Sequence, residues 1–430
     1  MIGGHAILAI HPAALRVLAQ GRQVVLVSGT NGKTTTTKLL AAALASPAAT
    51  EPRPVLTNLL GANMPTGLAA ALAAGPPGVP AVLEVDEAWL GRVAEQVRPS
   101  VIVLLNLSRD QLDRNNEVRH VAQRWRQACR EARGAVVVAN ADDPLVAWAA
   151  TGVAKVTWVG AGLRWRNDAT GCPECGGTIV FGEGPVPGDG PAPAEGPDGG
   201  WRCQKCGFSR PRADVWLDAG TAGGRAVFAT GESYPLALHL PGRCNQANAV
   251  MAMAGVVGAG GTAGAAVGAM AGVQEVAGRY ATFELEGVRA RLLLAKNPAG
   301  WAEVFDMLAP APAPVVIAIN ARTADGHDPS WLWDVPFEAL RGRPAIATGE
   351  RGLDLAVRLY YAQVDHTLVP DLVEAVRAAG RRRGPDGDGG STVDVVANYT
   401  SFHQLMARLG PGAATTRRAG AIATDGASAP

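Results

Sequence analysis

The chain of 430 residues carries 39 Lys and Arg against 38 Asp and Glu, a formal net charge of +1 at pH 7. This balance argues against a nucleic-acid-binding surface and against an acidic tail. The length predicts two or three domains. No apolar run reaches the length of a membrane span, and the first twenty residues lack the features of a signal peptide. We therefore expect a cytoplasmic protein without a transmembrane segment, in which paired cysteines indicate metal binding rather than disulfides.

Residues 24–45 predict a phosphate-binding loop between a buried parallel strand and a helix. Glycines let backbone N–H groups approach oxyanions, the lysine is a fixed cation, and the threonine after it can hold Mg²⁺. The strict P-loop pattern has glycine where Val27 stands, so the motif is a variant, and an ordinary strand–helix turn is the alternative. We interpret it as an ATP site. Its residues are Gly29, Thr30, Asn31, Gly32, Lys33, Thr34 and Thr35.

Three further apolar runs in the first 160 residues end in polar side chains. They alternate with helical patterns, which predicts a doubly wound α/β sheet that binds ligands at the carboxyl ends of its strands. Glu84 follows the first run and is expected to hold Mg²⁺ together with Thr34. A single Asp at such a strand end, for example Asp113 or Asp142, is equally typical of a helix N-cap. The polar residues at the strand ends are Glu84, Asp86, Glu87, Asn106, Asp110, Asp113, Asn140, Asp142 and Asp143.

Two C-x-x-C-G knuckles interrupt the α/β pattern, the first with Cys172 and Cys175 and the second with Cys203 and Cys206. Four thiolates in two such turns predict a closed tetrahedral zinc site with a structural role. The Pro/Gly-rich residues between the knuckles predict a disordered loop. A redox role is the alternative, but neither pair follows a strand of a thioredoxin-like unit. The other two cysteines, Cys129 and Cys244, are expected to be buried and unreactive.

The second half of the chain begins with a turn into a helix of small residues, on which Asn245 and Asn248 share one face. A second α/β unit follows from about Val288, with four strand–loop–helix repeats. Two of its loops hold Lys296 with Asn297 and, further along, Asp325 with His327 and Asp328.

These motifs resemble the central ATPase domain of the Mur ligases. The matching segments are GTNGKTT at 29–35, Glu84, NLSRDQLDR at 106–114, NADDP at 140–144 and GRCNQANA at 242–249. The resemblance implies ATP and Mg²⁺, with Asn140, Asn245 and Asn248 on the nucleotide side, and a carboxylate that is phosphorylated before an amine attacks it. Two features depart from the family. Little chain precedes the P-loop for a UDP-binding domain, and Gln111 stands where many Mur ligases have a metal-binding His, which leaves a second Mg²⁺ open.

The four cysteines, with AKNPAG, ADGHDPSWLWD and ANYTS further along, resemble the MurT family over roughly residues 20–410. The resemblance implies amidation of the D-glutamate α-carboxyl of lipid II to D-isoglutamine at the inner face of the membrane. It also implies a GatD-like glutaminase partner that supplies ammonia and whose Cys-His pair Asp328 completes. His327 replaces the usual Arg of this loop. From the residues alone, a helix N-cap directly before Pro329 explains Asp328 better than a catalytic role does.

We therefore expect an α/β protein with a Mur-ligase-like P-loop ATPase domain and a smaller Rossmann-like domain. The expected bounds are 1–285 for the first, with a zinc-ribbon insertion at about 165–215, 286–410 for the second, which contacts the glutaminase, and 411–430 for a disordered tail. A stand-alone ligase of the Mur or folylpolyglutamate type is one alternative, disfavoured by the missing N-terminal domain and by the zinc insertion. A zinc-ribbon protein that binds nucleic acid and uses the P-loop as a regulatory ATPase is another. The small number of basic residues near the knuckles argues against this nucleic-acid-binding alternative.

Overall fold

The computed structural model describes residues 2–45, 54–58, 62–109, 118–182, 200–220, 223–273, 280–308, 310–382 and 392–409. The chain forms two compact units. The first comprises Met1–Ala277, Lys296–Met307 and Ser330–Pro336, and the second Gly278–Ala295, Leu308–Pro329 and Phe337–Pro430. The predicted tail, the Pro/Gly tract and the segment with Asp110, Gln111 and Asp113 lie outside the described residues.

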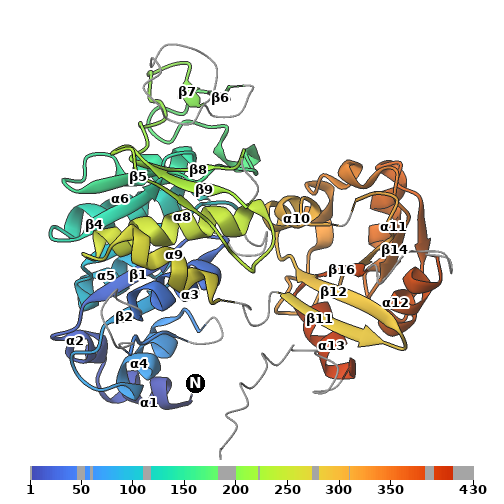
Figure 1. Ribbon diagram of the computed structural model, residues 1–430, viewed down its shortest axis with the longest axis horizontal. Coiled ribbons are helices and arrows are strands. Elements are labelled where there is room, and N and C mark those ends of the chain that lie inside the picture. Colours follow the sequence, from blue (N-terminus) through green and yellow to red (C-terminus); the bar gives the residue numbers. More distant parts are fainter. Residues whose placement is uncertain are drawn as a thin grey trace, which may run out of the picture. The chain divides into compact units, whose positions relative to one another are not determined.

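The first unit is built on an eight-stranded sheet with the spatial order β10-β9-β8-β5-β4-β3-β1-β2 (Figure 1). Neighbouring strands from β2 to β8 are parallel, and β9 and β10 are antiparallel additions at one edge. The strands β1, β2 and β3 are buried at every position, as expected of a parallel sheet covered on both faces. The strands are β1 (Val24–Ser28), β2 (Ala81–Glu84), β3 (Val101–Leu104), β4 (Val136–Asn140), β5 (Val156–Gly160), β8 (Val215–Asp218), β9 (Arg225–Phe228) and β10 (Ser233–Pro235).

Helices cover both faces of this sheet and bury two separate apolar cores. On one face, small side chains let α3 and α8 approach closely, and a Cβ on Gly255 would lie only 2.5 Å from Leu40. On the other face, the largest buried side chain is Trp125. The first face carries α3 (Lys33–Ala45), α8 (Arg243–Gly258) and α9 (Ala263–Ala271), and the second α1 (Ile2–Ile10), α2 (Ala14–Ala19), α4 (Pro65–Ala74), α5 (Leu90–Val97), α6 (Val118–Glu131) and α7 (Pro144–Ala150).

A small hairpin stands apart from this sheet, between β5 and β8 in the sequence (Figure 1). Its antiparallel strands are β6 (Ile179–Phe181) and β7 (Trp201–Cys203). The hairpin carries all four knuckle cysteines, and its small core of Trp201 and Ile179 also includes Ala147 of α7. It is preceded by the 3-10 helix η2 (Asn167–Ala169). We refer to residues 170–210 as the ribbon.

The second unit has a six-stranded sheet of order β11-β12-β16-β13-β14-β15, parallel except for the β11–β12 hairpin. Strand β11 lies before residue 286 but pairs with β12, because a tight turn joins the two. Among the helices described in the two units, none has both the length and the apolar character needed to cross a bilayer. The elements are β11 (Tyr280–Leu285), β12 (Val288–Leu294), β13 (Val315–Ala318), β14 (Ala345–Thr348), β15 (His366–Leu368), β16 (Val393–Ala397), η4 (Phe337–Leu340), α11 (Gly352–Tyr361), α12 (Leu372–Arg381) and α13 (Tyr399–Leu409).

Candidate functional site

The phosphate-binding loop lies at the carboxyl end of β1, and Asn106, just beyond β3, holds it in place. The backbone N–H of Thr30 donates to the carbonyl of Asn106 at 2.9 Å, and that of Asn31 to its Oδ1 at 2.9 Å. The Asn106 amide in turn donates to the Asn31 carbonyl at 3.0 Å. Gly32 ends the loop with φ of +85°, a left-handed conformation that favours glycine. These hydrogen bonds and the conformation of Gly32 fix the backbone of the loop.

Lys33 begins α3 and points its ammonium group back over the loop. The side chain is buried, and Nζ donates to the carbonyls of Gly29 and Thr30. It also forms an ion pair with Glu87, 3.0 Å from Nζ to Oε2. The sequence analysis named Glu87 as a strand-end residue but did not foresee this pair. No spacing rule relates a loop lysine to a carboxylate beyond the next strand in the sequence.

Thr34 and Glu84 are neighbours, as the sequence analysis expected of two magnesium ligands. The hydroxyl of Thr34 donates to Oε2 of Glu84 at 2.8 Å, and Glu84 is 2 % exposed. Asn58 fixes the Glu84 backbone through two hydrogen bonds of 2.7 and 2.8 Å. A hydroxyl and a buried carboxylate beside a phosphate loop are the oxygen ligands that nucleotide-bound Mg²⁺ uses in proteins. The role of both residues as metal ligands stays a prediction.

The end of β4 carries three polar residues with different tasks. Asn140 donates its amide to the carbonyl of Gly162 at 3.3 Å. Asp143 is the N-cap of α7, and burial raises its pKa to about 6 despite three backbone N–H donors. Asp142, one of the two Asp residues considered as a cap, instead forms a buried ion pair with Arg210 at 2.7 Å.

Asn245 and Asn248 lie on the first turns of α8, and Asn248 reaches the phosphate loop. The amide of Asn248 donates to Oδ1 of Asn245 at 3.4 Å. A Cβ on Gly32 would collide with Oδ1 of Asn248, so that this helix is packed directly against the loop. The structure thus brings together two of the predicted nucleotide-side residues and the glycine loop. Thr35, also predicted at the site, is buried on α3.

A further contact to the loop comes from a late part of the chain. Asn297 caps α10 (Pro298–Phe305) by accepting from the N–H of Gly300 at 2.8 Å. Its side chain also pairs with that of Asn31 through two hydrogen bonds of 3.2 and 3.3 Å. Asn297 was expected on a loop, but no sequence pattern predicts its contact with Asn31 of the phosphate loop.

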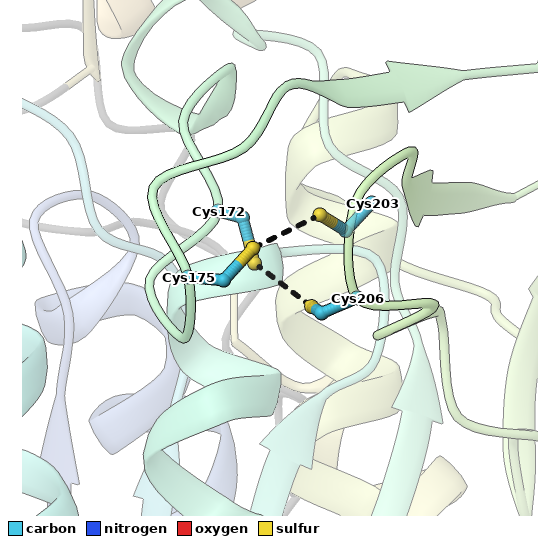
Figure 2. A group of neighbouring side chains, drawn as sticks. All are labelled: Cys172, Cys175, Cys203 and Cys206. Atoms are coloured by element: carbon cyan, nitrogen blue, oxygen red, sulfur yellow. Dashed lines mark hydrogen bonds between the residues drawn. The ribbon is translucent and has the colours of Figure 1, made fainter.

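The four cysteines of the ribbon converge on one point (Figure 2). The sulfurs of Cys172 and Cys206 are 3.7 Å apart, those of Cys175 and Cys203 are 3.5 Å apart, and all four lie within 4.8 Å of one another. Tetrahedral zinc with Zn–S bonds of about 2.3 Å places its sulfurs about 3.8 Å apart. Backbone N–H groups donate to the sulfurs of Cys175 and Cys203, an arrangement that favours the thiolate that a metal requires. The donor set therefore fits zinc.

The remaining two thiols lie outside the ribbon, and Cys129 is buried whereas Cys244 is half-buried. Burial raises the pKa of Cys129 to about 12 and that of Cys244 to about 12. A thiol that stays protonated at neutral pH is a poor nucleophile. The prediction that both cysteines are unreactive agrees with their surroundings.

Asp328 lies in the second unit, in an exposed position directly before the 3-10 helix η3 (Pro329–Trp333). The loop that carries it is fixed by Asp325, which is buried. The carboxylate of Asp325 accepts from the backbone N–H of Thr400 at 2.9 Å and from its hydroxyl. His327 is exposed, with Nδ1 3.2 Å from the carbonyl of Ala321. The position of Asp328 before a helical turn is compatible with both readings of this residue, the N-cap and the partner contact.

Sequence comparisons show where this arrangement belongs. The Mur ligase middle domain family matches residues 27–167, and the MurT ligase C-terminal family matches residues 294–402. The MurT subunit of the glutamine-hydrolyzing lipid II isoglutaminyl synthase of Streptococcus pneumoniae is 32% identical over 365 residues, which cover 80% of this chain and 78% of the relative. The chain belongs to the MurT family. The corresponding subunit of Staphylococcus aureus is 30% identical over 414 residues, 92% of this chain and 89% of the relative.

Solved structures support the fold. MurF from Acinetobacter baumannii superposes with a TM-score of 0.63 at 15% identity, over 92% of this chain and 79% of that chain. Folylpolyglutamate synthase from Mycobacterium tuberculosis superposes with a TM-score of 0.61 at 14% identity, over 96% of both chains. The predicted α/β fold of Mur-ligase type is therefore confirmed, and membership of the MurT family makes the protein an ATP-dependent ligase. The family implies ATP and Mg²⁺, and its name denotes a subunit of a complex. The alternative of a stand-alone ligase of the Mur or folylpolyglutamate type describes the chain less specifically than membership of the MurT family does.

The first prediction concerns magnesium. Glu84→Gln keeps an oxygen for the Thr34 hydroxyl but removes the charge that attracts the ion. We expect the Mg²⁺ concentration for half-maximal ATP-dependent activity to rise about tenfold or more, since even indirect partners of a metal contribute 10- to 100-fold. Glu95→Gln, an exposed change on α5, is the matched control. Superimposable magnesium titrations of Glu84→Gln and wild type would show that Glu84 is not a ligand.

The second prediction concerns the ribbon. Cys172→Ser should lower the bound zinc from about one per chain to near zero and lower the melting temperature with it, because a structural metal contributes folding free energy. Elemental analysis and a thermal melt measure the two effects. Cys129→Ser, which changes a thiol outside the ribbon, should keep the zinc. Wild-type protein that is fully stable after zinc removal would contradict a structural role.

Proposed function

We propose that the protein uses ATP to amidate the α-carboxyl of D-glutamate in the stem peptide of lipid II, giving D-isoglutamine. The observation that carries this proposal is the grouping of Lys33, Thr34 and Glu84 at a rigid phosphate loop in a member of the MurT family. The relatives are named as subunits of a lipid II isoglutaminyl synthase. Lipid II is anchored in the membrane, so the reaction takes place at the inner membrane face in the cytoplasm.

A carboxylate is a poor electrophile, and transfer of the terminal phosphoryl group of ATP converts it into a reactive acyl phosphate. The chain contributes positioning and charge to this step. Lys33 supplies a cation at the loop, and the N-terminus of α3 would offer backbone N–H groups to the phosphates. Bound Mg²⁺ would neutralise phosphate charge, and Thr34 and Glu84 are the residues placed to hold it. Asn140, Asn245 and Asn248 are assigned to the nucleotide.

Ammonia must reach the acyl phosphate as the free amine, and we assign its release to a second subunit, a GatD-like glutaminase. Two observations support this division. Outside the ribbon, the two thiols have a pKa near 12, so neither is suited to attack glutamine. The relatives are named as subunits of a glutamine-hydrolyzing enzyme.

Asp328 is assigned to the partner's reaction. Its carboxylate is exposed on a loop that Asp325 anchors, so that it can meet a histidine of another chain in a fixed position. An aspartate that accepts from Nδ1–H of a histidine fixes the tautomer and stabilises the imidazolium that forms when the histidine takes a proton. Asp328 would thus complete a Cys-His-Asp arrangement whose other members lie on the glutaminase. The ribbon cysteines are assigned to structural zinc.

The third prediction tests the ATP site. Lys33→Ala removes the cation next to the transferred phosphate and should lower amidation driven by added ammonium salt by orders of magnitude. Circular dichroism checks that the fold is retained. Lys38→Ala, on the same helix, should stay near the wild-type rate. Ammonia-driven amidation at an unchanged rate in Lys33→Ala would remove the nucleotide assignment.

The fourth prediction separates the two reactions. In the complex with the glutaminase, Asp328→Asn should lower glutamine-driven amidation by about 10³- to 10⁴-fold, as loss of the orienting carboxylate does in a hydrolase triad. Amidation driven by added ammonium salt should largely survive, because ammonia from solution bypasses the glutaminase. The two rates are measured on the same variant.

Asp354→Asn, an exposed change at the start of α11, is the control and should alter neither rate. An equal fall of both rates in Asp328→Asn would place this residue in the acyl phosphate reaction or in the fold. Two unchanged rates would leave Asp328 as a helix cap only.

A further inference from the structure

The ribbon contacts the nucleotide-binding part of the first unit at the end of β4. The indole N–H of Trp201, two residues before Cys203, donates to the carbonyl of Ala141 at 3.0 Å. The Nε–H of Arg210, four residues after Cys206, donates to Oδ1 of Asp142 at 2.7 Å. Both contacts come from residues next to the knuckles, so their geometry depends on the folded ribbon.

The pair of Arg210 and Asp142 is buried, with each side chain 8% exposed. The second carboxylate oxygen of Asp142 accepts from the backbone N–H of Gly162 at 2.6 Å. The backbone N–H of Asp142 donates to Oδ1 of Asn140 at 3.0 Å, and the Asn140 amide donates to the carbonyl of Gly162. Asp142 therefore joins the ribbon to the loops that follow β4 and β5.

From Gly162 the contacts continue to the phosphate loop. Ala161, next to Gly162, is buried in the apolar core that α8 also enters, and the guanidinium of Arg243, the first residue of α8, lies close to Gly162. Five residues further along α8, Asn248 is packed against Gly32 of the phosphate loop. A shift of the β4 and β5 loops would displace the start of this helix, because close packing leaves little space for adjustment.

We propose that Arg210 is a positioning residue that makes nucleotide binding depend on the zinc-loaded ribbon, through its ion pair with Asp142. With zinc bound, the ribbon holds Arg210 in place, and Arg210 holds the loops beneath α8. Loss of zinc releases Arg210 and leaves Asp142 buried without its cation, a costly state that the loops relieve by moving. The inference rests on the proposed nucleotide site but adds a role for the ribbon beyond stability.

The test measures binding and not turnover. The dissociation constant of a non-hydrolysable ATP analogue with Mg²⁺ is determined by calorimetry on the full chain, alongside zinc content. Arg210→Ala should keep about one zinc per chain and bind the analogue about tenfold more weakly, within the usual range of coupling between sites. Arg210→Lys keeps the charge and should recover part of the affinity. Arg202→Ala, an exposed change on the same ribbon, should bind as wild type does.

A second measurement combines zinc removal with the Arg210→Ala substitution. A chelator should weaken analogue binding to wild type about tenfold and have little further effect on Arg210→Ala, since the coupling is then already lost. By reciprocity, saturating analogue should tighten zinc binding to wild type by the same factor but leave zinc binding to Arg210→Ala unchanged.

Four outcomes would overturn the proposal. Wild-type affinity in zinc-loaded Arg210→Ala would show that the pair does not position the site. If zinc removal weakens analogue binding equally in wild type and in Arg210→Ala, the ribbon acts on the site through Trp201 and not through Arg210. If Arg210→Ala loses zinc or unfolds, Arg210→Lys decides, and unchanged affinity together with normal zinc in that variant counts against the proposal. Wild-type protein that binds no analogue would overturn the ATP site itself, and the coupling with it.

Discussion

The parallel register of β1 with its two neighbours is the constraint on which the nucleotide site depends. Val27 is level with Glu84 of β2 on one side and with Val103 of β3 on the other. Because parallel strands end at the same edge of a sheet, this register places Glu84 and Asn106 on either side of the phosphate loop. Thr34 then meets Glu84, and Asn106 meets the loop backbone. A slip of one residue would turn each of these side chains to the opposite face.

The buried ion pairs at this edge of the sheet orient side chains more than they stabilise the fold. The pairs Lys33–Glu87 and Asp142–Arg210 are largely shielded from water. A buried ion pair seldom stabilises a protein more than apolar side chains would, yet removing one partner costs about 3–5 kcal/mol. Such pairs are therefore poor sources of stability but hold their groups in one arrangement. For Lys33 this means an ammonium group kept over the loop, and for Asp142 a fixed link between two loops.

Much of this arrangement could be predicted from the sequence, and the reason is periodicity and spacing. The apolar runs predicted the parallel strands, the glycine loop predicted the start of α3, and the C-x-x-C-G repeats predicted four converging thiols. The contacts made by Glu87, Asn58 and Asn297 could not be predicted. Each depends on a side chain that meets a residue far away in the sequence, and an isolated Glu or Asn has no pattern that names its partner. The choice of Asp143 over Asp142 as the helix cap depends in the same way on Arg210, 68 residues further along the chain.

The loop of the second unit bears on the proposed role of Asp328 in a reaction on another chain. Asp325 and Asp328 are three residues apart but have opposite surroundings, one buried and bonded to Thr400 and the other exposed. The buried carboxylate of Asp325 fixes the backbone of the loop, which presents the exposed carboxylate of Asp328 at the surface. In water an exposed carboxylate is well solvated, and its attraction to a histidine is weak. A partner that covers it removes that water and strengthens the attraction, since a charge pair interacts more strongly at low dielectric. Docking itself would therefore switch on the orienting effect of Asp328, which would tie glutamine hydrolysis to the assembled enzyme.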